Sequence, residues 1–176
     1  DLYRDQEIDL PKTPHVKRDA LDAHSQRLYD MSAMDDYTVT EADVRSARHG
    51  YYANISYVDS LVGQLLNTLD KTNMLENTVV VFTSDHGDFL GERGLWYKMS
   101  YLEPSAHVPF IVWNPARFKA RRVAEPVTLA DILPTLSALG QGQDNAELAR
   151  TVDGRSLVPL LKGAAENPDY TAWGEY

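Results

Sequence analysis

The length, composition and charge of the chain limit what kind of protein it is. Its 176 residues are 43% hydrophobic and 24% charged, which suits one globular domain or a large part of one. The net charge of -9 argues against non-specific nucleic-acid binding, because such binding depends on Lys and Arg meeting phosphate. There is no cysteine, so disulfides and thiolate metal sites are excluded. A reducing compartment is compatible with this absence but not shown by it, and our expectation is a cytoplasmic protein. No apolar run approaches the roughly 20 residues that span a bilayer, so we expect no membrane partner.

The first part of the chain predicts one short and one long helix. The segment up to Pro14 is charged and contains prolines, which indicates a loop, and residues 16–31 indicate a short helix. The strongest helix begins at Thr40, because Thr40 and Asp43 form a capping-box pattern with Asp in place of the usual Glu. Apolar residues then recur at alternating four- and three-residue spacings and predict a helix with one apolar face, ending near residue 72. These residues are Tyr51, Ile55, Val58, Val62, Leu65 and Leu69.

Two short apolar runs predict strands on either side of a long loop. Residues 78–83 form a continuous β-branched run, which fits a strand covered on both faces as in a parallel sheet. Residues 110–113 predict a second strand, and the glycine-containing segment 87–109 between them is long enough to indicate a functional loop. Helix, strand, loop, strand and helix together indicate an α/β fold, in which ligands bind beyond the carboxyl ends of strands.

The last part of the chain predicts a helix and two short elements. Residues 127–139 are expected to be helical, with Pro134 as a kink or restart and Gly140 as the end. Residues 156–161 form a short apolar element, and residues 170–176 are expected to open a new strand.

The residues after the first predicted strand carry candidate metal ligands. Asp85 offers a hard oxygen and His86 an imidazole, but neighbours on an extended strand point to opposite faces. They therefore converge only if the chain turns at once, and we expect Gly87 to supply that turn through its conformational freedom. The alternative for this tripeptide alone is an ordinary turn with an Asx-type hydrogen bond. Its place at a strand end, before a glycine-containing loop, favours a site.

Lys98 is the second candidate, because an ammonium suits a point contact to a sulfate or phosphate oxygen or to a leaving group. The alternative is a solvated surface lysine, and Arg93 competes for the same role. We expect Asp88, Glu92 and Glu103 to support ligands or to hold the loop itself. The remaining candidates are expected to be surface or helix residues, and they are His15, His24 and His49.

Residues 83–98 read Thr-Ser-Asp-His-Gly-Asp-Phe-Leu-Gly-Glu-Arg-Gly-Leu-Trp-Tyr-Lys, and Glu103 and His107–Ile111 follow them. This pattern closely resembles the sulfatases of the alkaline phosphatase superfamily, and within that family the choline sulfatases. Further matching positions extend the resemblance over roughly residues 45–163. They are Tyr51–Ala53, Ile55, Val58–Asp59, Gly63, Thr128–Leu129, Asp131–Ile132, Pro134–Thr135 and Asp153–Ser156.

The resemblance implies a partial α/β domain with a mostly parallel sheet sandwiched by helices. Residues 1–168 would be the C-terminal part of the catalytic domain, and residues 169–176 the start of a smaller C-terminal subdomain. The implied reaction is hydrolysis of a small-molecule sulfate ester, choline-O-sulfate, to choline and sulfate. The implied nucleophile is a formylglycine made from a Cys/Ser-x-Pro/Ala-x-Arg motif, which this chain lacks. We therefore expect a fragment that is inactive by itself. Separately, we expect the complete enzyme to be a homo-oligomer.

The resemblance also implies site residues. Asp85 and His86 would ligate a divalent cation, Ca²⁺ or alternatively Mn²⁺, and Lys98 would contact the sulfate, so Lys98 and His86 are the expected catalytic residues. Glu175, on the same strand face as Trp173, would bind the choline ammonium. The alternative for these two residues is an ordinary edge strand.

One departure from the family pattern leaves the reaction open. Many sulfatases carry Asn where this chain has His86, and imidazole is a poor ligand for calcium but a good one for softer metals. Asp-His pairs also occur in the phosphatase and phosphonate-hydrolase branches of the superfamily. A phosphonate monoester or phosphodiester hydrolase therefore stays as the alternative, together with a non-catalytic binding segment.

Overall fold

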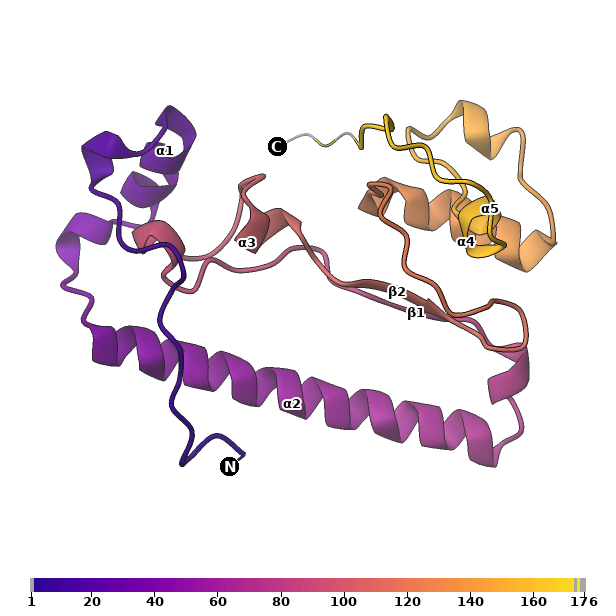
Figure 1. Cartoon of the computed structure of the whole chain (residues 1–176), viewed down its shortest axis with the longest axis horizontal. Coiled ribbons are helices and arrows are strands. Elements are labelled where there is room, and N and C mark those ends of the chain that lie inside the picture. Colours follow the sequence, from indigo (N-terminus) through magenta and orange to yellow (C-terminus); the bar gives the residue numbers. More distant parts are fainter. Residues whose placement is uncertain (1, 173, 175–176) are drawn as a thin grey trace. The chain divides into compact units, whose positions relative to one another are not determined.

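The computed structural model describes residues 2–172 and residue 174 (Figure 1). The chain forms two compact units, each described by itself below. Residues 1–75 and 83–110 make up the first unit, and residues 76–82 and 111–176 the second. Every candidate site residue between 83 and 110 therefore belongs to the first unit.

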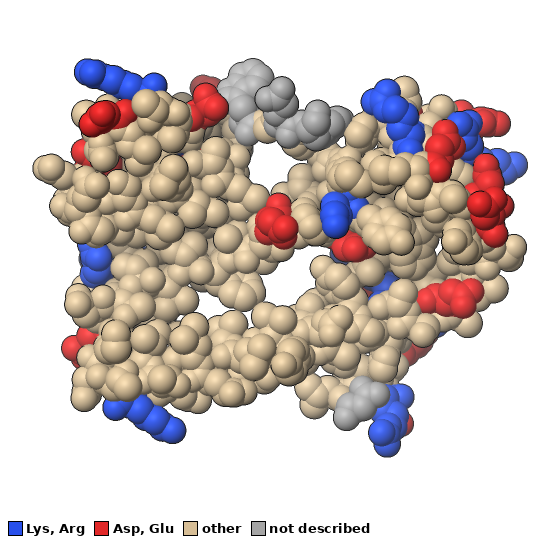
Figure 2. Space-filling model, turned by 180° about the vertical axis from the view of Figure 1, so that it is seen from behind, with Lys and Arg blue, Asp and Glu red and all other residues tan. Residues whose placement is uncertain are grey.

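The longest element of the first unit is helix α2, Glu41–Lys71 (Figure 1). The predicted capping box is confirmed: Thr40 Oγ1 accepts from the Asp43 N–H at 3.3 Å, and the Asp43 carboxylate accepts from the Thr40 N–H at 2.9 Å. The apolar face stays largely uncovered, with Ile55, Val58 and Leu65 among the exposed apolar residues. Figure 2 shows the middle of this helix as a band with little charge along the lower edge of the molecule.

Helix α1, Ala23–Met31, begins later than the predicted helix over residues 16–31. The reason is Asp22, whose side chain accepts from the backbone N–H groups of His24 and Ser25 and so sets the helix start. Leu28 and Tyr29 of α1 lie in a buried cluster with Phe89 and Leu95 of the loop after the first strand. This cluster attaches α1 to the loop that carries Lys98.

Strands β1, Val80–Thr83, and β2, Phe110–Trp113, form a two-stranded sheet at the two predicted places. The prediction that the first strand is covered on both faces is wrong for this chain, because Phe82 of β1 is exposed. Ile111 and Trp113 of β2 are exposed as well. The loop between the strands contains a 3-10 turn at Glu92–Gly94 and the short helix α3, Glu103–Ala106.

Helix α4, Ile132–Gln141, and the short helix α5, Val158–Leu161, belong to the second unit. Pro134 is the third residue of α4, where an N–H has no intrahelical partner, so the proline causes no break. The predicted end at Gly140 is wrong: the helix continues to Gln141, and Gly142, at φ +77°, caps it.

The chain beyond α5 is held by charged groups. The Glu166 carboxylate accepts from Arg121 at 2.8 Å and from the backbone N–H groups of Ala124 and Glu125. The Arg155 guanidinium lies 3.5 Å from the centre of the Tyr170 ring. Of the predicted strand over 170–176, residues 170–172 and 174 are described, and none of these is in a strand.

No helix in the described part of the chain is both long and apolar enough to cross a membrane.

Candidate active site

The chain turns immediately after β1, as the convergence of Asp85 and His86 requires. The Ser84 hydroxyl donates to the His86 carbonyl at 2.8 Å, and the His86 N–H donates to Asp85 Oδ1 at 3.0 Å. These bonds bend the backbone within three residues and bring the two side chains to one side of the turn.

Gly87 has a different reason to be glycine than the sequence suggested. It is not among the residues with positive φ, so conformational freedom does not explain it. A Cβ at this position would instead lie 2.1 Å from the carbonyl oxygen of Pro104, well inside contact distance. The Gly87 N–H donates to the Ser105 carbonyl at 2.7 Å. Glycine is therefore needed because the backbone of α3 packs directly against the turn.

A backbone hydrogen bond sets the tautomer of His86. Its Nδ1 lies 2.8 Å from the Gly87 carbonyl, which can only accept, so Nδ1 carries the proton. In the neutral ring this leaves a lone pair on Nε2, and Nε2 lies 3.4 Å from Asp85 Oδ2. Metal–ligand bonds of about 2.0–2.6 Å place two ligands of one ion at about this separation.

The pair is open to a ligand and suitably charged. The Asp85 side chain is 82% exposed and that of His86 40%. Partial desolvation acts to raise the pKa of Asp85, but the hydrogen bonds from the His86 N–H and the Ser84 hydroxyl, together with attraction to the imidazole ring in its protonated form, keep the pKa below its usual value. The two residues thus fit a divalent cation. No group of three or more His, Cys, Asp or Glu that could hold a metal occurs among the described residues, so this pair could supply only part of a coordination shell.

Lys98 returns to the turn along a hairpin-like loop. The Phe89 N–H donates to the Tyr97 carbonyl at 2.8 Å, and the Gly91 N–H to the Leu95 carbonyl at 3.0 Å. This register places Lys98 opposite Asp88, two residues from His86. Lys98 is partly buried, and within the described chain its ammonium has no ion-pair partner.

The backbone around Lys98 is strained. Tyr97 has φ +67° and Met99 φ +71°, a conformation that costs of order 1–3 kcal/mol for each non-glycine residue. Such strain persists only where the surroundings hold it, and it is concentrated at functional sites.

Arg93, the competitor of Lys98, lies at the other end of this hairpin. Its backbone N–H donates to the Thr13 carbonyl, and its carbonyl accepts from the Val16 N–H, both at 3.0 Å. The geometry therefore favours Lys98 as the residue next to the Asp85–His86 turn.

The predicted supporting carboxylates hold the loop. Asp88 accepts from the Leu90 N–H at 3.0 Å, and Glu92 accepts from the N–H groups of Lys12 and Thr13 at 2.9 and 2.8 Å. Glu103 pairs with His107 at 2.6 Å within and just after α3.

One further anchor of the loop, Arg48 of α2, could not be recognised from the sequence. Arg48 is 8% exposed, and its guanidinium donates to Asp9 at 2.6 Å and to the Leu90 carbonyl at 3.4 Å. It also lies 3.9 Å from Glu92. An isolated Arg in an amphipathic helix carries no local signal of such contacts.

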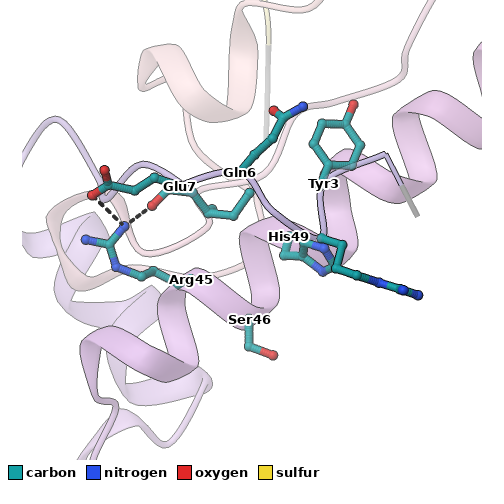
Figure 3. Close-up of a pocket in the computed structure, with 8 residues that line it drawn as sticks. Tyr3, Gln6, Glu7, Arg45, Ser46 and His49 are labelled. Atoms are coloured by element: carbon teal, nitrogen blue, oxygen red, sulfur yellow. Dashed lines mark hydrogen bonds and ion pairs between the residues drawn. The ribbon is translucent and has the colours of Figure 1, made fainter.

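Two of the predicted site residues are not placed. Glu175 and Trp173, the predicted choline contacts, are outside the described residues. A shallow depression of about 530 Å³ on the first unit is lined by none of Asp85, His86 and Lys98 (Figure 3). The Arg45 side chain, at its edge, points toward Glu7 and donates to the Ile8 carbonyl.

Comparison with known proteins decides the family. The model of the sulfatase family matches residues 12–142. The chain belongs to the sulfatase family. It is 43% identical over 163 residues to choline-sulfatase of Rhizobium meliloti (strain 1021), covering 93% of this chain and 31% of that protein. It is 38% identical over 128 residues to arylsulfatase K of Gallus gallus, covering 73% and 23%.

Solved structures agree with this assignment. Phosphonate monoester hydrolase SpPMH from Silicibacter pomeroyi matches with a TM-score of 0.73 and 27% identity, over 93% of this chain and 33% of that one. The putative sulfatase yidJ from Bacteroides fragilis matches with a TM-score of 0.64 and 29% identity, over 89% and 36%. The predicted fold class, a partial sulfatase-like α/β domain, is thereby confirmed. The sulfatase chain described here spans about a third of the length of these two structures, and 31% of the choline-sulfatase.

Proposed function

We propose that the complete protein hydrolyses a sulfate ester, choline-O-sulfate, and that this chain supplies part of the site. The observation that carries the proposal is the Asp85–His86 pair, 3.4 Å apart at the end of β1, in a chain of the sulfatase family. The 43% identity to a choline-sulfatase supports the choice of ester.

The residues of this chain have distinct roles in that reaction. Asp85 and His86 hold a divalent cation, and Lys98 donates to a sulfate oxygen and holds the ester in place. The cation, when bound, polarises the ester oxygens and stabilises the charge that builds on them. The chain contains no motif for a formylglycine, so its described residues bind and orient and leave the nucleophile to another segment.

The metal follows from the donor set. We propose Ca²⁺, the family's usual ion, and the imidazole nitrogen of His86, a poor ligand for calcium, makes Mn²⁺ the alternative. Replacing His86 by Asn should lower the affinity for Mn²⁺ more than that for Ca²⁺, as measured by metal titration of the complete protein. Equal loss for the two ions would mean that the imidazole is not a ligand.

Glu175 is proposed to hold the choline ammonium. Glu175→Gln should raise the KM for choline-O-sulfate more than the KM for an uncharged sulfate ester, because only the first substrate carries a cation for the carboxylate to attract. An equal effect on the two esters would remove Glu175 from the choline site.

The second candidate function is hydrolysis of a phosphonate monoester, favoured by His86 and by the TM-score of 0.73 to such a hydrolase. The complete protein should be assayed on choline-O-sulfate and on a phosphonate monoester. A higher kcat/KM on the phosphonate would overturn the sulfatase proposal. Lys98→Ala should lower kcat by about 10²–10³ on the better substrate, since it removes a charged donor from the transferring group.

Three further proposals concern the complete protein: a homo-oligomeric state, a cytoplasmic location, and a boundary at residue 168 before a smaller subdomain. The 176-residue chain alone is expected to bind Ca²⁺ weakly and to be inactive, since it offers two ligands of the proposed shell. Strong binding by this piece would instead favour a separate binding role.

A further inference from the structure

The segment that carries Lys98 has an unusual backbone. Six non-glycine residues of the described chain have positive φ, and four of them lie between residues 90 and 99: Leu90, Arg93, Tyr97 and Met99. Two of these, Tyr97 and Met99, are the immediate neighbours of Lys98. Since L residues rarely adopt this conformation, contacts outside the segment must hold it.

The carbonyl groups on both sides of Lys98 are held by hydrogen bonds. Before it, the Tyr97 carbonyl accepts from the Phe89 N–H at 2.8 Å, within the hairpin. After it, the Met99 carbonyl accepts from His24 Nε2 at 2.6 Å, and His24 belongs to helix α1. The second bond joins residues 75 positions apart, so α1 directly sets the path of the chain as it leaves Lys98.

His24 is well placed and correctly protonated for this contact. The Asp22 carboxylate caps α1 and accepts from the His24 N–H at 3.1 Å. His24 Nδ1 lies 3.3 Å from Nη2 of Arg27, and a guanidinium can only donate. Nδ1 is therefore the acceptor, so Nε2 carries the proton that it donates to Met99. His86 has the opposite tautomer, with the proton on Nδ1.

Helix α1, which carries His24, packs against the loop that carries Lys98. Leu28 and Tyr29 of α1 lie in the buried cluster with Phe89 and Leu95 of the hairpin. The hydrogen bond from His24 to the Met99 carbonyl therefore restrains the backbone beside Lys98. A hydrogen bond to a water molecule would not restrain it in this way, because the water is not attached to the fold.

We propose that His24 is a positioning residue for Lys98: its bond to the Met99 carbonyl maintains the left-handed turn that fixes the direction of the Lys98 side chain. The proposal rests on the proposed role of Lys98 as a contact to the substrate oxyanion. It assigns a function to a histidine that the sequence suggested was an ordinary helix residue.

The test uses the complete protein and six variants, assayed on the better of choline-O-sulfate and a phosphonate monoester. His24→Ala should lower kcat/KM by about 10–100-fold, because a displacement of about 1 Å in a positioning group has effects of this size. His24→Gln should stay within about threefold of wild type, because its amide reaches as far as Nε2 and can donate to the same carbonyl. His24→Asn is polar, but its side chain is too short to reach the Met99 carbonyl, so its kcat/KM should fall as much as that of His24→Ala. This variant replaces His24→Ala in the comparison if the alanine variant fails to fold.

Gln26→Ala is the matched control. Gln26 also lies on α1 and donates to a main-chain carbonyl at 3.0 Å, but that carbonyl belongs to Leu21 and not to the Lys98 loop. It should stay within about twofold of wild type. A loss equal to that of His24→Ala would mean that any weakening of α1 reduces activity, and would overturn the proposal.

A double-mutant comparison separates positioning from folding. If His24 acts through Lys98, His24→Asn should cause no further loss in a Lys98→Ala background. Multiplicative losses in the double variant would overturn the proposal for His24 and leave the role of Lys98 intact. Full activity of Lys98→Ala would instead remove Lys98 from the site, and the positioning role of His24 with it.

Discussion

The close contact between Gly87 and α3 gives the sharpest prediction for the turn that carries Asp85 and His86. In Gly87→Ala the new Cβ would meet the Pro104 oxygen at 2.1 Å. Carbon–oxygen contacts are normally about 3.3 Å or longer, so the two backbones must separate by about 1.2 Å. That movement would stretch the 2.7 Å bond between the Gly87 N–H and the Ser105 carbonyl beyond hydrogen-bonding range.

The magnitude follows from these two effects. Overpacking costs about 1–3 kcal/mol and an unsatisfied buried N–H about 1–3 kcal/mol. Because breaking the bond relieves part of the clash, we expect a loss of about 2–4 kcal/mol in the free energy of unfolding. The same shift would displace Asp85 and His86 and should lower kcat by about 10–100-fold.

The assay is urea unfolding of the complete protein followed by circular dichroism, together with turnover of choline-O-sulfate. Gly50→Ala serves as control, because it lies within α2 and a Cβ there meets nothing within 4 Å. The control should gain about 0.5–1 kcal/mol, the helix propensity difference between Ala and Gly. A Gly87→Ala variant as stable and as active as wild type would refute the claim that α3 packs on the turn.

Three other predictions concern the framework. Gly140→Ala should raise stability by about 0.5–1 kcal/mol in thermal unfolding, because the residue is helical; a loss would show that it caps α4 after all. Arg48→Met should lower the free energy of unfolding, measured in urea, by about 2–3 kcal/mol. This is less than the loss for a fully buried ion pair, because the Asp9 side chain is 52% exposed. An unchanged unfolding midpoint would mean that Arg48 does not anchor the loop. Hydrogen bonds from Tyr52 and Arg48 lower the pKa of Asp9, so this carboxylate stabilises the fold above its unfolded pKa. That contribution is lost as pH falls through the folded pKa, so wild type and Asp9→Asn should differ at neutral pH and converge in acid; a constant difference between them would contradict this.

Features that depend on neighbours in sequence were predictable. The Thr40–Asp43 capping box, the long helix and both strands follow from patterns a few residues long, and each lies where it was predicted. Gly142 rather than Gly140 ends α4 because helix propensity alone does not decide which of two nearby glycines takes positive φ.

Features that depend on distant contacts were not predictable. The sequence contains a glycine after His86, but the reason that glycine is needed there is a carbonyl group 17 positions away in α3. No local sequence pattern contains that contact. The bonds of Arg48 to Leu90 and of His24 to Met99 likewise join segments 42 and 75 residues apart. The candidate site residues could be proposed from a short motif, whereas the contacts that support them depend on the tertiary fold.

The uncovered face of α2 has a practical consequence for handling the protein. A helix of 31 residues is about 46 Å long, and between Arg48 and Asp70 its only charged residue is Asp59. The apolar positions from Tyr51 to Leu69 extend over about 27 Å of this length. An apolar face of that size favours self-association in water, because burying it removes ordered solvent. Expressed as an isolated piece, the segment should therefore be prone to precipitation, and solubility at high concentration would show whether other polypeptide shields the helix.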